Sequence, residues 1–411
     1  MKKIELLAPA GSFEKAKTAF QYGADAVYCG TSSLSLRTRA DMGNDDLVKT
    51  IKYAHSIGKR VHVTLNIFAW DEKYEEIIEM AKILEEVKPD AIIAADGGVI
   101  ETLKEYAPSI PIHVSTQANI VSLRDCNFWY KNGAKRVIMA REMNKEQLKY
   151  IMENKPEDLE VEMFGHGAIC FAFSGRCFLS DFLSKRSANL GDCAQSCRWS
   201  YKLYAEERNN PGQYMPVEES EYGTSIFSSK DLCLIREIPE IIDMGVDSLK
   251  IEGRLKTEYY IATVINAYRN AIDAYQKDPQ NYNPEKYLKE LEKVKTRELT
   301  TFYFNDRENK DIQDFSGKQY NEGYEFGGKI VEKIDDKYVI EIKNKLNVGD
   351  YLEIIIPNKI ESQTFQIKKL WDYETKEEIE AVSPGVKGQK VLMEIPFECE
   401  NNLIIRRKKW L

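Results

Sequence analysis

Up to about residue 276, short apolar runs alternate with longer stretches whose apolar positions recur at the helical period. The apolar runs predict strands at 4–8, 26–30, 60–66, 91–96, 112–116, 136–141, 160–165 and 248–253. The stretches of helical period predict helices at 12–22, 45–57, 74–87, 97–106, 119–132, 144–153, 235–244 and 258–275. This alternation predicts an α/β fold, a (β/α)8 barrel of TIM type. An open doubly wound sheet is the alternative, although the segment after the first strand lacks the glycine spacing of a phosphate loop.

Two regions depart from this alternation. Residues 166–232 interrupt the predicted barrel (residues 1–276) after its seventh strand, and this insertion contains most of the cysteines. Because barrel enzymes place their chemistry in the loops after strands, the insertion is expected on the active face. Residues 277–322 predict a polar, partly helical connector. Apolar positions then alternate with period two over residues 323–411, which predicts a small C-terminal β-barrel domain.

Composition describes a soluble globular protein. The 411 residues are 43% hydrophobic, and 58 Lys and Arg against 66 Asp and Glu give a formal charge of −8. This composition excludes disorder and a coiled coil. The charge argues against a uniformly basic surface that binds nucleic acid, although a local basic groove is compatible with it. The start of the chain has no signal-peptide pattern, and no apolar run is long enough to cross a membrane, so we predict a cytoplasmic protein with reduced thiols.

Five of the eight cysteines lie in or just after the insertion: Cys170, Cys177, Cys193, Cys197 and Cys233. Thiolates gathered in a reducing compartment favour a soft metal centre, either zinc or an iron-sulfur cluster. Structural zinc usually uses CxxC pairs, which this sequence lacks, so the wide intervals favour a cluster bound by an irregular loop. The alternative is that some of these thiols are small buried apolar groups. We expect that packing role for the other three cysteines.

Several motifs carry a family resemblance. They are the segments 5–11, 23–28, 166–177, 191–193 and 250–254. Together they resemble the collagenase-like peptidase family of unknown catalytic type, family thirty-two, along the whole barrel. The length and the C-terminal β-domain resemble the members of that family that hydroxylate tRNA.

The resemblance implies a 4Fe-4S protein that hydroxylates carbon 5 of the wobble uridine in tRNA. The implied product is 5-hydroxyuridine, made without molecular oxygen and with prephenate as the hydroxyl source. The implied cluster ligands are Cys170, Cys177, Cys193 and Cys233. Cys197 is the alternative fourth ligand, because some relatives use a pair spaced like Cys193 and Cys197. Other relatives hydroxylate a cytidine of 23S ribosomal RNA or take part in oxygen-independent ubiquinone synthesis, and a heteromeric partner of the same family is compatible with the resemblance.

A uracil ring must be held by stacking and by hydrogen bonds to its edge. Polar residues at the predicted strand ends are therefore candidates, and we expect catalytic roles for Asn66, His113, His166, Glu252 and Arg254. A satisfied structural network of polar groups is the alternative for each of them.

Guanidinium groups bind the carboxylates of a ligand such as prephenate in bidentate fashion. We assign this role to Arg141, Arg254, Arg37 and Arg39. Contacts to the phosphates of the anticodon stem are expected from Arg176, Lys185, Arg186, Arg198 and Lys202, and from the terminal run 406–409. Solvated side chains with no ligand are the alternative for these basic residues.

Two other functions compete with RNA hydroxylation. A peptidase needs an activated nucleophile or a metal-bound water, and the sequence has neither HExxH nor GxSxG. His166 and Cys170 are the conceivable pair, but a thiolate that binds a cluster cannot also be a free nucleophile. The third function is a non-catalytic RNA-binding protein whose iron-sulfur cluster is only structural.

Overall fold

The computed structural model describes residues 3–31, 34–35, 41–170, 177–199, 201, 203–206, 208, 211–212, 214–217, 229–306, 308–309, 312, 323–385 and 389–408. Arg37, Arg39, Arg176 and Lys202 lie outside the described residues. The chain forms two compact units. The first comprises Met1–Phe13, Asp25–Leu255 and Thr296–Gln319, and the second comprises Glu14–Ala24, Lys256–Lys295 and Tyr320–Leu411.

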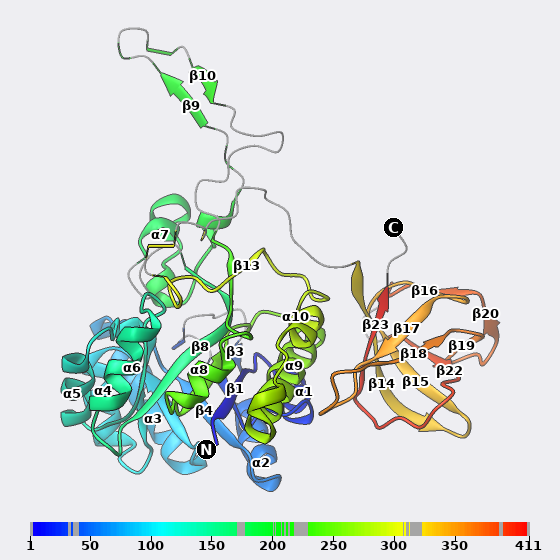
Figure 1. The fold of residues 1–411 in the computed structure, drawn as a ribbon, viewed down its shortest axis with the longest axis horizontal. Helices are drawn as coiled ribbons and strands as arrows, with labels where there is room; N and C mark the ends of the chain where they lie inside the picture. The colour runs from blue at the N-terminus through cyan, green and yellow to red at the C-terminus, as the bar shows by residue number, and fades with distance from the viewer. Residues whose placement is uncertain are drawn as a thin grey trace. The chain divides into compact units, whose positions relative to one another are not determined.

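The first unit is built on a closed barrel of parallel strands (Figure 1). They are β1 (Glu5–Pro9), β2 (Ala26–Thr31), β4 (Arg60–Thr64), β5 (Ala91–Ala94), β6 (Ile112–Val114), β7 (Ala134–Ile138), β8 (Glu160–Ala168) and β12 (Ser248–Ile251). Each pairs in parallel with the next in this order. The cylinder closes because β12 pairs in parallel with both β8 and β1. The predicted (β/α)8 barrel is therefore confirmed, and the open sheet is excluded.

The helices of the first unit alternate with these strands along the chain. They are α2 (Asn44–Ser56), α3 (Tyr74–Val87), α4 (Gly97–Tyr106), α5 (Leu123–Lys131), α6 (Lys145–Asn154), α7 (Leu179–Ser184) and α8 (Ile238–Asp243). Two begin with strong caps: the Asp96 carboxylate accepts from the first turn of α4, and Asn144 forms a capping box with Gln147 on α6. In the part of the chain that the structure describes, no helix has the length and apolar character needed to span a bilayer.

The insertion returns to the barrel through a strand that the sequence pattern did not predict. β11 (Asp231–Cys233) pairs antiparallel with the end of β8, so that Cys233 lies opposite His166. β13 (Leu299–Thr300) then pairs in parallel with β11. The described parts of the insertion also contain η4 (Ala188–Leu190), η5 (Ser196–Arg198) and the hairpin of β9 (Leu203–Glu206) and β10 (Tyr214–Val217).

The second unit combines α1 (Phe13–Gln21), α9 (Glu258–Lys277) and α10 (Glu285–Leu291) with the predicted β-domain, which is confirmed as an antiparallel half-barrel. Its strands, in spatial order, are β18 (Gln363–Gln366), β17 (Tyr351–Ile354), β23 (Ile404–Lys408), β14 (Tyr324–Ile334), β15 (Lys337–Ile342), β22 (Lys390–Met393), β19 (Leu370–Asp372) and β20 (Glu378–Ile379). The buried Tyr22 hydroxyl fixes α1 to this sheet, because it donates to the Ile355 carbonyl and accepts from the Ile404 amide.

Arg406 has a structural role in this unit. Its side chain is fully buried and forms ion pairs with Glu290 (2.8 Å) and Glu353 (2.6 Å). The adjacent Arg407 pairs with Glu325 and Asp350. The expectation that Arg406 and Arg407 contact RNA phosphates is wrong, because internal carboxylates already occupy both guanidinium groups. Residue 409 lies beyond the described part of the run.

Candidate functional site

An ionic network fills the barrel interior near the N-terminal ends of the strands. The Arg136 guanidinium pairs with Glu5 (2.5 Å) and Glu162 (3.0 Å), and the Lys250 ammonium lies 2.9 Å from the other Glu162 oxygen. None of these four side chains is more than 5% exposed. Burial alone would raise the pKa of Glu162, but Lys250 and Arg136 hold it below its usual value. These two buried acids and two buried bases balance in charge, as a stable interior requires.

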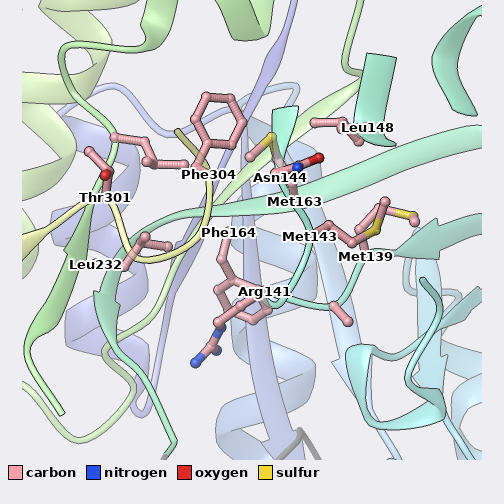
Figure 2. A pocket seen from close by; sticks show the side chains of 12 residues that line it. Met139, Arg141, Met143, Asn144, Leu148, Met163, Phe164, Leu232, Thr301 and Phe304 are labelled. Atoms are coloured by element: carbon pink, nitrogen blue, oxygen red, sulfur yellow. The ribbon is translucent and has the colours of Figure 1, made fainter. Parts of the chain in front are cut away.

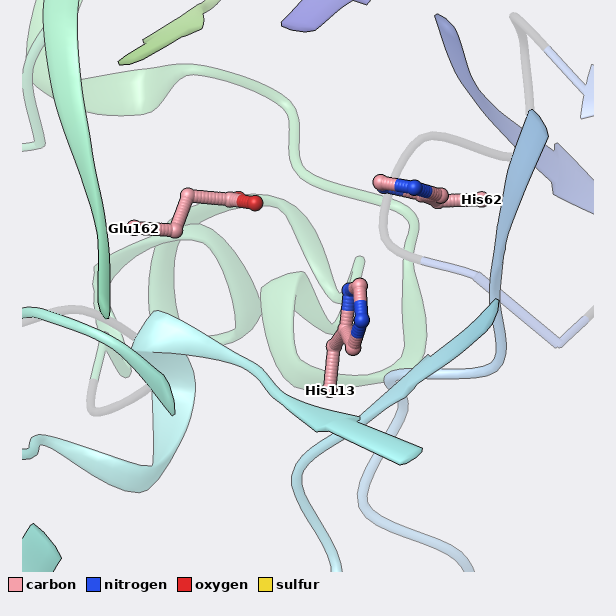
Figure 3. A group of neighbouring side chains, drawn as sticks. All are labelled: His62, His113 and Glu162. Atoms are coloured by element: carbon pink, nitrogen blue, oxygen red, sulfur yellow. The ribbon is translucent and has the colours of Figure 1, made fainter. Parts of the chain in front are cut away.

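Two histidines adjoin this network, and Figure 3 shows His62 and His113 directed toward Glu162. Ligand atoms of the three residues lie within 4.8 Å of one another, which is the spacing of a metal site. However, both Glu162 oxygens already accept hydrogen bonds, from Lys250 and Arg136. Burial, followed by the charge of Arg136, lowers the pKa of each histidine well below its usual value. A divalent ion would add positive charge beside two buried cations, so we assign this trio to the structural core.

Closer to the C-terminal ends of the strands, polar side chains form a second layer, which we call the mouth. The Tyr28 hydroxyl lies 3.0 Å from the Ile251 carbonyl and 3.2 Å from the Glu252 carboxylate. Burial first, and then the charge of Glu252, raises the pKa of Tyr28 well above its usual value, so the phenol stays protonated. Arg254, 3% exposed, donates to Thr64 (3.2 Å) and Ser35 (3.1 Å).

A glycine allows β8 to approach Glu252 closely at the mouth. Gly167 has φ +108°, and a Cβ there would lie 2.6 Å from the Glu252 carbonyl oxygen. The Glu252 amide also donates to the His166 carbonyl at 2.9 Å. Glu252 is therefore positioned by the backbone of β8 as well as by its own strand.

Arg141 is a mouth residue with an unused donor. Its guanidinium stacks 3.8 Å from the centre of the Phe164 ring, and Nη1 donates to the Ala168 carbonyl at 2.8 Å. Its buried Nε has no hydrogen-bond partner among the described residues. Figure 2 shows Arg141 beside Phe164 at a methionine-rich pocket. The pocket is only about 30 Å³, room for one or two water molecules, which is too small for a nucleoside.

Four cysteines of the insertion influence one another electrostatically. Burial raises the pKa of Cys197; Arg198 opposes this, and the thiols of Cys170, Cys193 and Cys177 raise it further. Two separate segments of the insertion thus place four thiols near one another.

Side-chain bonds join the two cysteine-bearing segments. The Ser180 hydroxyl, on α7, donates to the Arg186 carbonyl (2.7 Å) and accepts from the Ala194 amide (2.8 Å). Arg198 donates to the Ile169 carbonyl at 3.2 Å, and Arg186 pairs with Asp192 at 2.6 Å. Two of the arginines expected at phosphates therefore also hold the insertion together, whereas Lys185 is exposed.

The model of Peptidase family U32 matches residues 11–314, and the model of its C-terminal domain matches residues 322–406. The chain belongs to peptidase family U32. Its relatives include tRNA hydroxylation protein P1 of Bacillus subtilis, 38% identical over 90% of this chain and 87% of that protein. They also include tRNA hydroxylation protein P of Escherichia coli, 35% identical over 98% of this chain and 96% of that protein.

A more distant relative is the 23S rRNA 5-hydroxycytidine synthase of Escherichia coli, 30% identical over 87% of this chain and 53% of that protein. Among solved structures, the U32 peptidase Mk0906 aligns with a TM-score of 0.40 and 16% identity, over 62% of this chain and 94% of that chain.

In this U32 member, the predicted site residues fall into two groups. Glu252, Arg254 and Arg141 meet at the mouth, whereas His113 lies in the buried layer against His62, their ring centres 4.8 Å apart. Three further predicted residues are buried near strand ends: Asn66 (9% exposed), His166 (1%) and Cys233 (7%).

Sequence reasoning missed Tyr28 and the Glu162–Lys250 pair. A charged residue at an inward position of an apolar strand is the signal that could have found the pair, because an unpaired charge is not tolerated there.

Proposed function

We propose that the chain is an RNA-modifying hydroxylase that converts the wobble uridine of tRNA to 5-hydroxyuridine. The observation that carries this proposal is its likeness to tRNA hydroxylation proteins along nearly the whole chain. The ribosomal relative, whose name gives 5-hydroxycytidine as its product, supports the same chemistry on another pyrimidine.

We further propose that the insertion binds a 4Fe-4S cluster through Cys170, Cys177 and Cys193. The set fits such a group, because its donors are all thiols and Arg198 offsets their negative charge. We propose Cys233 as the fourth ligand, with Cys197 as the alternative. Cys233 lies opposite His166 at the end of β8, whereas the other three thiols act electrostatically on Cys197. When bound, a cluster of this kind exchanges single electrons.

The residues of the mouth would then bind and orient the reactants. The Tyr28 hydroxyl donates its only proton to the Ile251 carbonyl and the Glu252 carboxylate, which fixes the direction of Glu252. Glu252 would then offer an acceptor to the edge of a pyrimidine. Arg254, held by Thr64 and Ser35, and Arg141, with its unused Nε, would bind the carboxylates of prephenate. Hydroxylation replaces the hydrogen on carbon 5 by a hydroxyl, a two-electron oxidation of the uridine. In this proposal prephenate supplies the hydroxyl as its C–O bond breaks, takes up the replaced hydrogen in its place, and is itself reduced by two electrons.

The test is mass spectrometry of tRNA nucleosides from a strain that lacks the gene. We expect 5-hydroxyuridine and its derivatives to disappear and to return with the wild-type gene, but not with Cys170→Ala or Cys193→Ala. Cys399→Ala is the matched control and should restore them fully, because Cys399 lies in the C-terminal domain. If tRNA is unchanged but ribosomal RNA loses 5-hydroxycytidine, the substrate is ribosomal RNA instead of tRNA. If neither RNA changes, the proposed hydroxylase function is wrong.

Proteolysis is not proposed. A nucleophile and its base must share one accessible cleft, yet His166 is 1% exposed inside β8 while Cys170 is exposed beyond its end.

A further inference from the structure

Exposed apolar side chains of the first unit concentrate on one face. Among its described residues, seven large apolar side chains that are at least 40% exposed lie in segments that follow barrel strands: Trp70, Val121, Phe178, Phe182, Leu183, Trp199 and Leu255. The C-terminal ends of all parallel barrel strands open on the same side, so these residues surround the mouth. Apolar surface gathered in this way marks an interaction site.

Three aromatic rings in the insertion dominate this face, and we call Phe178, Phe182 and Trp199 the aromatic ridge. Phe178 and Phe182 are 67% and 65% exposed and lie one turn apart, because the Phe182 amide donates to the Phe178 carbonyl. Trp199, 42% exposed, directly follows η5, which packs against α7. The Ser180 hydrogen bonds described above hold these two segments together, so the rings are presented to solvent on a fixed support.

Positive charge accompanies the ridge although the whole chain is acidic. Lys185 is exposed at the end of α7, and Arg198 directly precedes Trp199. Aromatic faces interleaved with cations are the features by which proteins bind unpaired nucleic-acid bases, with the rings stacking on bases and the cations meeting phosphates.

We propose that the aromatic ridge stacks the unpaired nucleotides that flank the base in the mouth. This inference rests on the proposed function, since a base that enters the mouth brings its neighbours onto the surrounding rim. It adds to that function a preference for an RNA loop over a duplex, because the bases of a duplex are already stacked on each other.

The test measures the affinity of the full-length protein for two RNAs by fluorescence anisotropy. One is an anticodon stem-loop with an unmodified wobble uridine, and the other is a blunt duplex with the sequence of the stem. Phe182→Leu and Trp199→Leu should each weaken stem-loop binding about tenfold and leave duplex binding unchanged. Phe182→Tyr and Trp199→Phe retain a ring and should bind within about twofold of wild type. Phe128→Leu, at a 56% exposed ring on α5, is the matched control and should have no effect.

The outcomes separate the ridge from the proposed function. Wild-type protein that binds neither RNA would count against both. Wild-type protein that prefers the stem-loop, with leucine variants that bind it equally well, would overturn the ridge alone. Equal losses for loop and duplex would mean that the rings do not act by stacking on unpaired bases, and would overturn the inference too. If the aromatic and leucine variants instead change the molecular mass measured by sedimentation, the ridge is a protein interface, and the inference is wrong.

Discussion

The two halves of the barrel interior use the same eight strands for different purposes. Toward the N-terminal ends, Arg136, Glu162 and Lys250 satisfy one another in a closed network. At the mouth, Arg141 keeps an unused buried donor, and thiols gather in the insertion just beyond it. A polar interior therefore does not by itself indicate a functional site. Buried atoms without a hydrogen-bond partner occur in both halves, because Nδ1 of His62 and Nδ1 of His113 also lack one among the described residues. The neighbouring thiols of the insertion are what distinguish the mouth.

The largest expected effect is the loss of activity when a mouth thiol is removed. Cys193→Ala should reduce hydroxylation below about 1% of wild type, since removing a metal ligand costs at least as much as removing the groups that support one. The thermal midpoint of the barrel should change little, because its core lies elsewhere. Turnover on a tRNA transcript and a calorimetric scan measure the two quantities. If Cys193→Ala retained half of the wild-type activity or more, the thiols would not take part in the reaction.

The N-terminal half should show the opposite behaviour. Glu162→Gln removes the shared partner of Lys250 and Arg136 and should lower the free energy of unfolding by about 3–5 kcal/mol. Glu160→Gln is the matched control, because Glu160 also pairs with Arg136 but is 34% exposed, and it should cost at most about 1 kcal/mol. Urea unfolding measures both variants. Similar small losses for the two would mean that the network does not hold the barrel together.

Below about pH 6.5, acid should destabilise the buried N-terminal half of the barrel interior, which contains His62 and His113. The unfolded chain takes up a proton on His62 and on His113 as the pH falls through 6.5, whereas the folded barrel keeps both rings neutral. Each ring should therefore lower stability by about 1.4 kcal/mol per pH unit. His62→Asn should remove about half of this slope between pH 6.5 and pH 5, as measured by urea unfolding. A slope identical to that of the wild type would show that His62 binds its proton in the folded state.

The smallest expected effect concerns Asp96, a polar residue on the same side of the barrel as the mouth. Asp96 follows β5 on the active face, but its carboxylate caps α4 by accepting from Gly98 and Val99. Asp96→Ala should lower the free energy of unfolding by about 1 kcal/mol and leave hydroxylation unchanged. A loss of turnover without a loss of stability would make Asp96 a functional residue.

Sequence patterns predicted the barrel well because each strand contains a short apolar run and the helices between them follow the helical period, with side-chain caps at the start of α4, α5 and α6. Asn119 shows where they failed. The helix expected over 119–132 begins only at Leu123, because Asn119 adopts a left-handed conformation with φ +54° and Ser122 provides the cap. The strand β18 escaped prediction because three of its four residues face solvent.

The sequence predicted those residues of the candidate site whose chemical type alone indicates a ligand, but not the contacts between distant residues. Thiols and guanidinium groups indicate their ligands by type, so Cys170, Cys193 and Arg141 could be chosen from the sequence. The bond between Tyr28 and Glu252 spans 224 positions, and no local pattern records a contact made by barrel closure. The burial of Arg406 likewise depends on Glu290 and Glu353, which its sequence neighbours do not reveal.

The most direct measurement is the iron and acid-labile sulfide content of the full-length protein purified without oxygen. We predict equal amounts of iron and sulfide with the broad visible absorption of a thiolate-bound cluster, retained in Cys399→Ala and lost in Cys170→Ala. Colourless wild-type protein that contains one zinc ion and no sulfide would contradict a cluster at the barrel mouth.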